Sequence, residues 1–535
     1  MSLPRFFSRT ADAVMPVAAV DRDTLAARLD QVRVAVVVDE PAVESDAGRA
    51  GHLLAVNLAA RLYPHLHLTG PTDATQTAAE LAHAIAPGID VTTGPVPADT
   101  TVAVVLDADP VGLADSPVVH AAAQGWAVDI DGHLPARSSR SPGNALSSLA
   151  AAAVALGEAF RTVFAAELGD RGRRRRQPGG FHLVTLAGSG GGADDDTPDL
   201  AVAPYLGDAC LVGAGAVGNA ALLALRSAGA RGRLAVVDHE TVALSNLQRY
   251  VLTTDADVGV PKVELAARLF AASGLAVEPV PTRWGADPRT GAGWDCVLVA
   301  LDSAADRLAV AAGLPRRAYN AWTQPADVGW SWHEQFGLRP CLGCLYYPDR
   351  PRPSQHELLA DVLEQPALRM LAYLTLRTAI GTALPGVPQV QLLPVTADTP
   401  RWLETSLLDD LVAAGKIGPG EAAQWAGRDI ASLYRDGVCA GGLLSLGPRR
   451  GDDAVVPLAH QSALAGIMLA TSALVAADER LDPLRPRAAS EARLDMLRGF
   501  PQVLPRPRER TNGCFCSDPE YLAAARTLTP HELTR

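Results

Sequence analysis

Apolar runs alternate with amphipathic stretches along the first third of the chain. Residues 32–38 (VRVAVVV) are apolar except for Arg33, as in a buried strand, and residues 47–62 carry apolar side chains at helical spacing. Residues 65–68 and 101–106 predict further strands, with a helix over 75–85 between them. Strands that alternate with helices indicate a parallel α/β sheet. An Ala-rich helix over 144–168 would close this unit.

The same order of elements returns further along the chain. Strands are predicted over 210–212, 233–237 and 296–301, with helices over 216–228 and 262–273 and a second Ala-rich closing helix over 460–477. We therefore predict an α/β fold of two tandem Rossmann-like units, related by duplication and pseudo-dimeric within one chain.

Changes in composition set the expected domain boundaries. The five expected regions are a first unit over 1–170, a flexible linker over 171–200, a second unit over 201–340, a mostly helical crossover insertion over 341–440, and the closing part of the second unit over 441–535. The linker carries a basic, a glycine-rich and an acidic run, a composition that cannot bury a core, and only residues 181–186 between these runs look strand-like.

Composition and charge exclude several classes of protein. The chain has 535 residues, of which 48% are hydrophobic and 20% charged, so it can bury large cores. A net charge of -12 argues against a nucleic-acid binder, which needs cations to meet phosphates. The longest apolar stretch, 463–478, is short for a membrane span and reads as a buried helix. With no apolar secretory segment at the N-terminus, we expect a cytoplasmic protein without membrane partners.

A glycine motif in the second unit predicts a nucleotide site. Gly213, Gly215 and Gly218 fit the pattern G-x-G-x-x-G between a strand and a helix. Such glycines let the backbone approach a phosphate, and the helix N-terminus supplies N–H donors. Asp238 ends the next strand, where a carboxylate can bind a ribose diol. These features alone fit NAD as well as ATP.

The residues that follow favour ATP. Ser245-Asn246-Leu247-Gln248-Arg249 comes after Asp238, Gly259-Val260-Pro261-Lys262 opens the next helix, and a later strand ends in Asp302. Lys262 is one of only two lysines in the chain. In this order the sequence resembles the E1-like family of ThiF, MoeB and ubiquitin-activating adenylyltransferases.

The resemblance implies a role for each motif residue. Asp238 would hold the ribose, Asn246 and Arg249 the phosphates, and Lys262 the β- and γ-phosphates, while Asp302 would bind Mg²⁺. The chemistry asks for such groups independently, because attack of a carboxylate on the α-phosphate brings anions together and expels pyrophosphate.

Four cysteines in two close pairs predict a structural zinc site. Cys341 and Cys344 form a C-x-x-C turn, and Cys514 and Cys516 form a C-x-C turn near the C-terminus. Two thiolate pairs can complete a tetrahedral Zn²⁺ site that ties the C-terminal segment to the crossover. E1-like proteins usually use two C-x-x-C pairs, so the second pair departs from the family pattern. Reduced surface thiols are the alternative.

Cys439 lies in a glycine-rich stretch between the first cysteine pair and the closing helix, close to Arg435. A nearby cation favours the nucleophilic thiolate. In ubiquitin-type E1 enzymes, a cysteine of the crossing segment takes over the acyl group as a thioester. We therefore name Cys439 as a candidate catalytic residue beside Arg249, Lys262 and Asp302; a buried, inert cysteine is the alternative.

The first unit lacks the glycine motif and resembles the inactive half of a two-half E1. In that family an arginine of the partner's N-terminal segment reaches the ATP, and Arg5 and Arg9 are the candidates here. The expected cargo is a ubiquitin-like protein, with a separate E2 partner, in a bacterial system of the defence-operon kind. Four matters stay open: adenylation of a ribosomal peptide, activation of a sulfur carrier, a binding-only leader-peptide scaffold, and association of two chains.

Overall fold

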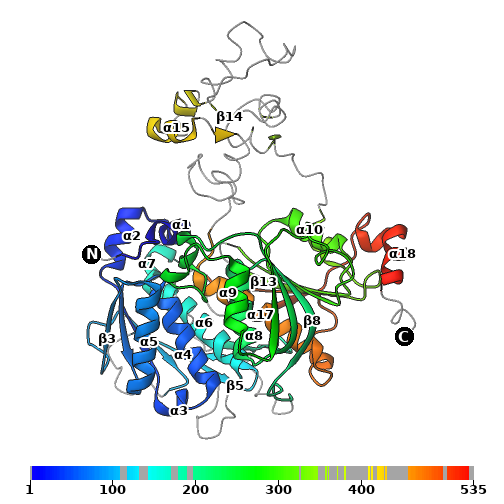
Figure 1. Ribbon diagram of the computed structural model, residues 1–535. Helices are drawn as coiled ribbons and strands as arrows, with labels where there is room; N and C mark the ends of the chain where they lie inside the picture. Colours follow the sequence, from blue (N-terminus) through cyan, green and yellow to red (C-terminus); the bar gives the residue numbers. More distant parts are fainter. Residues whose placement is uncertain are drawn as a thin grey trace. The chain divides into compact units, whose positions relative to one another are not determined.

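The computed structural model describes residues 3–108, 117–131, 143–169, 179–188, 197–324, 327–347, 456–497 and 503–528, with short stretches between 356 and 429. The chain forms two compact units, Met1–Tyr347 with Pro457–Arg535, and Pro348–Val456. In the second of these, the described elements include helix α15 (Pro419–Trp425) and a short antiparallel pair, β14 (Ala379–Ile380) with β15 (Arg428–Asp429) (Figure 1).

The N-terminal part of the large unit is built on a seven-stranded sheet in the order β3-β2-β1-β4-β5-β6-β7. Its strands are β1 (Arg33–Val37), β2 (His65–Thr69), β3 (Asp90–Thr93), β4 (Val102–Leu106), β5 (Val118–Gln124), β6 (Ala127–Ile130) and β7 (Gly179–His182). Strands β1 to β5 pair in parallel, whereas β6 and β7 add antiparallel pairs.

A second sheet, of eight strands, has the order β10-β9-β8-β11-β12-β13-β16-β17. Its strands are β8 (Tyr205–Val212), β9 (Arg231–Val237), β10 (Leu275–Val280), β11 (Cys296–Val299), β12 (Arg317–Thr323), β13 (Asp327–Glu334), β16 (Glu491–Asp495) and β17 (Leu504–Arg506). The first five pair in parallel and the last three join antiparallel, so the first seven strands repeat the order of the first sheet.

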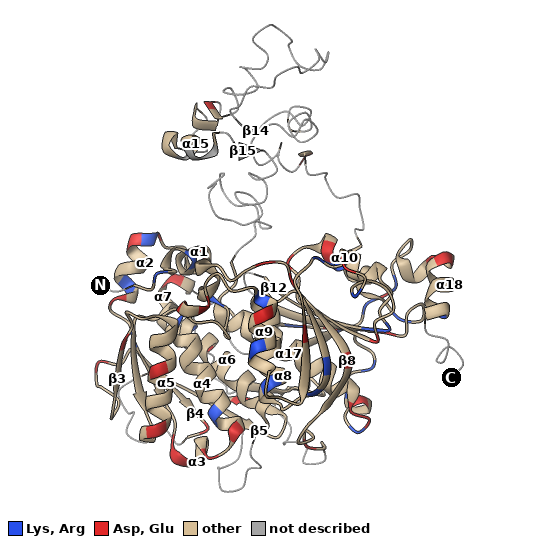
Figure 2. Ribbon diagram, in the orientation of Figure 1, with Lys and Arg blue, Asp and Glu red and all other residues tan. Residues whose placement is uncertain are grey.

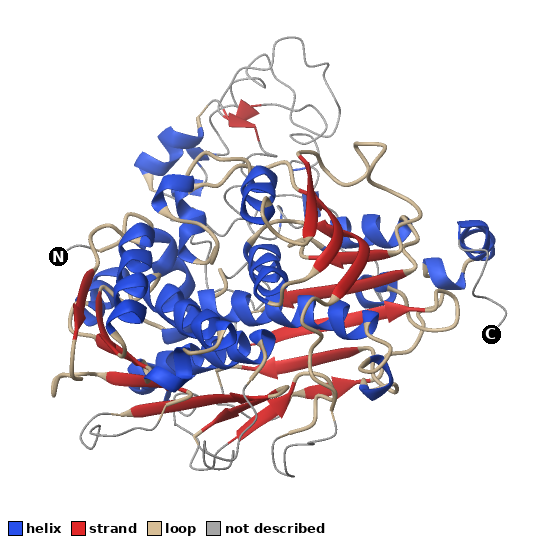
Figure 3. Ribbon diagram, turned by 60° about the horizontal axis from the view of Figure 1, so that its bottom comes forward, coloured by secondary structure: helices blue, strands red, loops and turns tan. Residues whose placement is uncertain are grey.

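Two pairs of helices fill the space between the sheets (Figures 1 and 3). In the first part α4 (Asp46–Ala60) packs on α6 (Ala145–Val163), and in the second α8 (Ala216–Ser227) packs on α17 (Ala459–Ala477); α6 also packs on α17. α6 and α17 are long and apolar enough to span a membrane, but they are 94% and 89% buried inside the protein over their most apolar windows. The prediction of a buried late helix is confirmed.

The remaining elements of the large unit lie around this framework. They are α1 (Phe7–Ala18), α2 (Arg22–Leu29), α3 (Glu40–Val43), α5 (Thr72–Ile85), α7 (Ala165–Leu168), η3 (Leu244–Gln248), η4 (Asp255–Asp257), α9 (Lys262–Phe270), α10 (Ala304–Ala312), α11 (Leu342–Tyr346), η6 (Asp482–Leu484), η7 (Phe515–Ser517) and α18 (Pro519–Leu528).

The mixed α/β class with largely parallel sheets is confirmed, and two details differ from the sequence prediction. The predicted helix over 144–168 is two helices, α6 and α7, because Phe164 leaves the helical region at φ -102 and ψ 24. Strand β7 overlaps the strand-like stretch of the predicted linker but begins earlier, at Gly179, and this part of the linker is ordered: Phe181 is fully buried and anchors it beside β6.

Candidate nucleotide and metal sites

The glycine motif forms a tight turn between β8 and α8. Gly213 has φ +94, and a Cβ on it would lie 2.6 Å from the carbonyl oxygen of Ala300. A Cβ on Gly218 would lie 2.0 Å from the carbonyl oxygen of Gly213, so only glycine lets α8 start this close to the turn. The first backbone N–H groups of α8 carry the positive end of the helix dipole, which favours an anion here.

Asp238 follows β9 and braces this turn. Its Oδ2 accepts a hydrogen bond from the backbone N of Ala214 at 2.8 Å, and its Oδ1 accepts one from the backbone N of Glu240 at 2.9 Å. The side chain is half-buried. The carboxylate therefore lies at the glycine loop, where the sequence placed a ribose ligand.

The S-N-L-Q-R motif forms the short helix η3 and the loop after it. Asn246 caps the start of η3, because its Oδ1 accepts from the backbone N of Ala243 at 2.9 Å. Arg249 and Lys262 both approach the ring of Tyr250: Arg249 Cζ lies 5.8 Å and Lys262 Nζ 5.2 Å from its centroid. Two cations thus converge on one buried aromatic side chain.

Lys262 is an unusually buried lysine, with a side chain that is 4% exposed. Its Nζ donates to Glu240 Oε2 at 2.5 Å. Burial works to lower the pKa of Lys262, but Tyr250, Asp238 and Glu240 outweigh it and raise the pKa above its ordinary value. Lys262 is therefore a fixed positive charge at neutral pH.

Arg249 connects the site to two further charged residues. Burial lowers the pKa of Arg249; Tyr250 raises it, the positive charge of Arg9 lowers it further, and the negative charge of Asp302 raises it. Asp302 follows β11 and is exposed. The structure thus brings the predicted residues from β9, η3, α9 and β11 to one end of the second sheet.

The N-terminal arginines behave differently from each other. Arg5 donates to Asp255 on η4 at 2.8 and 2.9 Å. Arg9 lies on α1, which packs against η3. Arg9 pairs with Asp12 at 3.6 Å, and its positive charge helps to lower the pKa of Arg249.

In the first sheet, the equivalent turn between β1 and α4 is built differently. A Cβ on Gly48 would lie 1.8 Å from the carbonyl oxygen of Ala42, so Gly48 occupies the place that Gly218 has at the start of α8. The rest of the turn is longer, contains α3 and is acidic (Figure 2). Together with the first residue of α4, it carries four acidic residues. They are Asp39, Glu40, Glu44 and Asp46. Ser45 already caps α4, and the negative charges oppose a phosphate there.

The four predicted metal ligands lie together and are buried. Their sulfur atoms are all within 4.8 Å of one another, with Cys341 Sγ 3.5 Å from Cys514 Sγ and Cys344 Sγ 3.3 Å from Cys516 Sγ. Four sulfurs around Zn²⁺ at ~2.3 Å would be about 3.8 Å apart. The C-x-C spacing of the second pair therefore does not prevent a compact four-sulfur cluster.

The chemistry of the cluster fits a divalent cation. Hydrogen bonds among the thiols lower the pKa of Cys516 to about 6 and also lower that of Cys344, while they contribute to a raised pKa at Cys341. The backbone N of Thr511 also donates to Cys344 Sγ at 3.4 Å. Four thiolates this close together would repel one another, and a Zn²⁺ ion would offset that repulsion.

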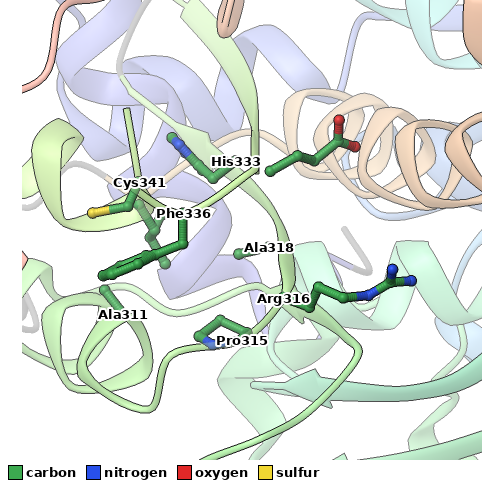
Figure 4. A pocket seen from close by; sticks show the side chains of 9 residues that line it. Ala311, Pro315, Arg316, Ala318, His333, Phe336 and Cys341 are labelled. Atoms are coloured by element: carbon green, nitrogen blue, oxygen red, sulfur yellow. The ribbon is translucent and has the colours of Figure 1, made fainter. Parts of the chain in front are cut away.

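A shallow pocket lies beside this cluster, between α10, β12 and β13 (Figure 4). Cys341, His333 and Phe336 line one side of it, and Phe336 also packs against the four cysteines. His333 is held by the carbonyl oxygen of Pro340 at 3.1 Å and by Ser331 Oγ at 2.9 Å. These contacts make the pocket part of the packing of the cluster.

The remaining cysteines separate into two groups. Cys210 and Cys296 are buried on β8 and β11, and burial raises their pKa, that of Cys296 to about 12. They are inert core residues, as the sequence indicated. Cys439 lies outside the residues that the structure describes.

Two residues of the candidate nucleotide site could not be recognised from the sequence. Glu240 and Tyr250 both contact Lys262. The only hint in the sequence is their position: Glu240 is two residues after Asp238, and Tyr250 directly follows Arg249.

The second part of the chain is similar to known proteins. The ThiF family profile matches residues 208–478. The uncharacterized protein y4jF of Sinorhizobium fredii is 34% identical over 541 residues, which are 98% of this chain and 97% of that protein. The resemblance to y4jF thus includes the N-terminal sheet as well.

Shorter matches carry functional names. A molybdopterin-synthase adenylyltransferase of Salmonella typhimurium is 40% identical over 107 residues, 19% of this chain and 43% of that enzyme. A SAMP-activating enzyme E1 of Haloferax volcanii is 45% identical over 75 residues, 14% of this chain and 27% of that enzyme. The structure of E. coli MccB with MccA-N7isoASN aligns with a TM-score of 0.30 at 11% identity, over 59% of this chain and 67% of that one.

Proposed function

The chain belongs to the ThiF family, and on that premise we propose that it is an ATP-dependent adenylyltransferase that activates the C-terminal carboxylate of a small protein. One observation carries the proposal: Lys262 and Arg249 converge on Tyr250 beside a glycine turn that Asp238 braces. Two fixed cations next to a helix N-terminus form a site for a polyphosphate.

In the proposed reaction, a carboxylate oxygen of the cargo attacks the α-phosphorus of ATP. The new bond is O–Pα, the Pα–O–Pβ bond breaks, and pyrophosphate leaves with its electron pair. Lys262 and Arg249 stabilise the charge that gathers on the leaving group, and Asp238 orients the ribose. Asp302, exposed at the end of β11, would hold Mg²⁺, which neutralises phosphate charge when bound.

We assign the nucleotide to the second sheet alone, as the active copy of a duplicated unit. The turn before α4 presents acidic side chains and a serine cap where the turn before α8 presents glycines. From the first part of the chain, Arg9 would reach the active site within the same chain; its effect on the pKa of Arg249 supports this choice over Arg5. Gly48, at the place of Gly218, supports a common origin for the two units.

We propose that the four-cysteine cluster holds one structural Zn²⁺ ion. The ligands would be Cys341 and Cys344 from the turn at α11 and Cys514 and Cys516 from the turn at η7. The ion would bind the C-terminal segment to the edge of the second sheet, and it takes no part in the adenylation step.

For the cargo, we favour a ubiquitin-like protein over a sulfur carrier or a ribosomal peptide, with Cys439 as acceptor. Its thiolate would attack the acyl carbon of the adenylate, and AMP would leave as a thioester forms. An E2-like protein would then take the acyl group, in a bacterial defence system. The presence of Arg249, Lys262 and Asp302 argues against a binding-only scaffold.

The thioester step has a direct test on gels. The protein, ATP, Mg²⁺ and a ubiquitin-like protein from the same organism are incubated, and the products are run on gels with and without reductant. We expect a reductant-sensitive conjugate that Cys439→Ala abolishes and Cys210→Ala retains. A conjugate that survives in Cys439→Ala removes this residue from the mechanism and leaves adenylation intact.

The nucleotide assignment is tested by calorimetric titration with Mg²⁺-ATP and, separately, with NAD⁺. We expect one ATP per chain and no heat of binding from NAD⁺ at the same concentration. Binding of NAD⁺ without ATP would return the glycine motif to a redox enzyme, and two ATP per chain would contradict the inactive first copy.

A further inference from the structure

The loop that carries the phosphate-binding arginine is held from two directions. It runs from Leu247 to Thr253 and includes Arg249 and Tyr250. On one side Asn219, from the helix of the glycine motif, accepts a hydrogen bond from the backbone N of Leu252 at 2.6 Å. This contact ties the loop to α8 in its own half of the protein.

On the other side the loop is held by the first part of the chain. Arg61, at the end of α4, donates through Nη1 to the carbonyl oxygen of Leu247 and through Nη2 to that of Thr253 at 2.9 Å. Asn57, one turn earlier, donates to the carbonyl oxygen of Val251 at 2.8 Å. Two side chains of one helix thus bind three carbonyl groups along a seven-residue loop.

The arrangement of Arg61 is rigid and costly. Its side chain is 1% exposed, and burial lowers its pKa to about 9. Its Nε donates to Asn57 Oδ1 at 2.8 Å, which fixes the plane of the guanidinium against the loop. Burial of a guanidinium among neutral oxygens is unfavourable, because the charge loses its hydration. The buried group therefore needs hydrogen-bond acceptors for its N–H groups.

We propose that Arg61, with Asn57, is a positioning residue of the nucleotide site, and that the first half is therefore a required part of that site. By fixing the carbonyl groups of Leu247 and Thr253, Arg61 holds the ring of Tyr250 where Lys262 and Arg249 meet it. This inference rests on the proposed function, because it assigns the purpose of the loop to ATP binding.

The chain offers a matched control in Arg161. This residue lies on α6, is also 1% exposed, and donates across to the second half, to the carbonyl oxygen of Leu497 at 3.2 Å. It pairs with Glu158 at 2.5 Å. Leu497 follows β16 and lies outside the 247–253 loop, so Arg161 shares the burial and the inter-half contact of Arg61 but not its acceptors.

The test compares Arg61→Lys, Asn57→Ala and Arg161→Lys in the full chain. Two quantities are measured for each: the dissociation constant of Mg²⁺-ATP by calorimetry, well below the unfolding midpoint, and the midpoint of denaturation in urea. We expect Arg61→Lys to weaken ATP binding at least tenfold and Asn57→Ala at least threefold. Arg161→Lys should lower the midpoint while its ATP affinity stays within twofold of wild type.

The outcomes distinguish a failure of the positioning role of Arg61 from a failure of the proposed function. If the wild-type chain binds ATP and both Arg61→Lys and Asn57→Ala bind it equally well, the positioning role is wrong and the proposed function stands. If Arg161→Lys weakens ATP binding as much as Arg61→Lys does, Arg61 contributes only to the general stability of the protein. A wild-type chain that binds no ATP overturns the proposed function and this inference together.

Discussion

Lys262 Nζ lies 2.5 Å from Glu240 Oε2, and the lysine is buried although the glutamate is 59% exposed. Glu240 thus neutralises the cation that the proposed mechanism assigns to the phosphates. A phosphate that enters the site has to compete with this carboxylate for Lys262.

This relationship predicts that Glu240→Gln binds ATP more tightly. The amide keeps the shape of the side chain but removes the competing charge, and a half-exposed ion pair of this kind is worth ~0.5 to 1 kcal/mol, or about threefold in affinity. Calorimetric titration with Mg²⁺-ATP measures the change. Weaker binding in Glu240→Gln would mean that Glu240 orients Lys262 for the nucleotide instead of competing for it.

Two glycines of the turn before α8, Gly215 and Gly218, predict opposite phenotypes. A Cβ on Gly215 would meet only the hydroxyl of Tyr250, at 3.6 Å, whereas one on Gly218 would lie 2.0 Å from the carbonyl oxygen of Gly213. We expect Gly215→Ala to keep the stability of wild type and to lose ATP affinity at least tenfold, because its methyl group occupies the approach of a phosphate. We expect Gly218→Ala to lower the free energy of unfolding by about 2 kcal/mol or more.

Urea denaturation and ATP titration of both variants check this pair of outcomes. If Gly215→Ala binds ATP as wild type does, the phosphates do not approach the turn at that residue.

The cysteine cluster predicts one zinc ion per chain. Elemental analysis of the purified protein measures the metal content, and Cys516→Ser should lose the ion and lower the melting temperature by about 10 °C, since the ion links two distant segments. Gly343→Ala should show a similar loss, because its Cβ would lie 2.9 Å from Cys514 Sγ. If the wild-type protein contains no bound metal and has the same melting temperature as Cys516→Ser, the four cysteines are reduced core thiols and hold no zinc.

Two buried histidines predict a loss of stability in acid. Burial lowers the pKa of His52 from 6.5 to about 4 and that of His460 from 6.5 to about 3. Between those values and 6.5 the unfolded chain binds protons that the folded chain does not, so the free energy of unfolding falls as the pH drops from 6.5 towards 4. Above 6.5 these groups contribute no pH dependence.

Each histidine accounts for a few kcal/mol, on the order of 3, over that range. Urea denaturation from pH 7 to pH 4 measures the slope, and His460→Gln should flatten it. An unchanged slope in His460→Gln would show that the pKa of His460 is not lowered in the folded protein.

Short-range pattern was sufficient for much of the framework. Continuous apolar β-branched runs located β1, β4, β9 and β11, because strands buried on both faces tolerate little else. It was insufficient for β12 and β13, where Asn320, Ser331 and His333 interrupt the apolar pattern. Those polar groups are hydrogen-bonded to one another in the core, a tertiary arrangement without a local signature.

The site shows the same division. Asp238 follows β9, Arg249 follows η3 and Lys262 opens α9, an order that sequence alone could recognise, and the fold brings them together. Arg61 could not be recognised in that way, because it ends an ordinary amphipathic helix and its partners lie 186 and 192 residues further along the chain. Gly48 was missed because the turn before it is longer than the glycine pattern allows.

The central claim, adenylation of a carboxylate at the Lys262–Arg249 site, is tested most directly by exchange of labelled pyrophosphate into ATP. The assay uses the full chain, Mg²⁺-ATP and a ubiquitin-like protein from the same organism, with Lys262→Met as the inactive variant and Arg161→Lys as the matched control. We predict exchange that requires the C-terminal carboxylate of the cargo, falls at least a hundredfold in Lys262→Met, and persists in Arg161→Lys. Exchange that is equally fast in Lys262→Met, or wild-type protein that binds ATP and this cargo without any exchange, would contradict the account.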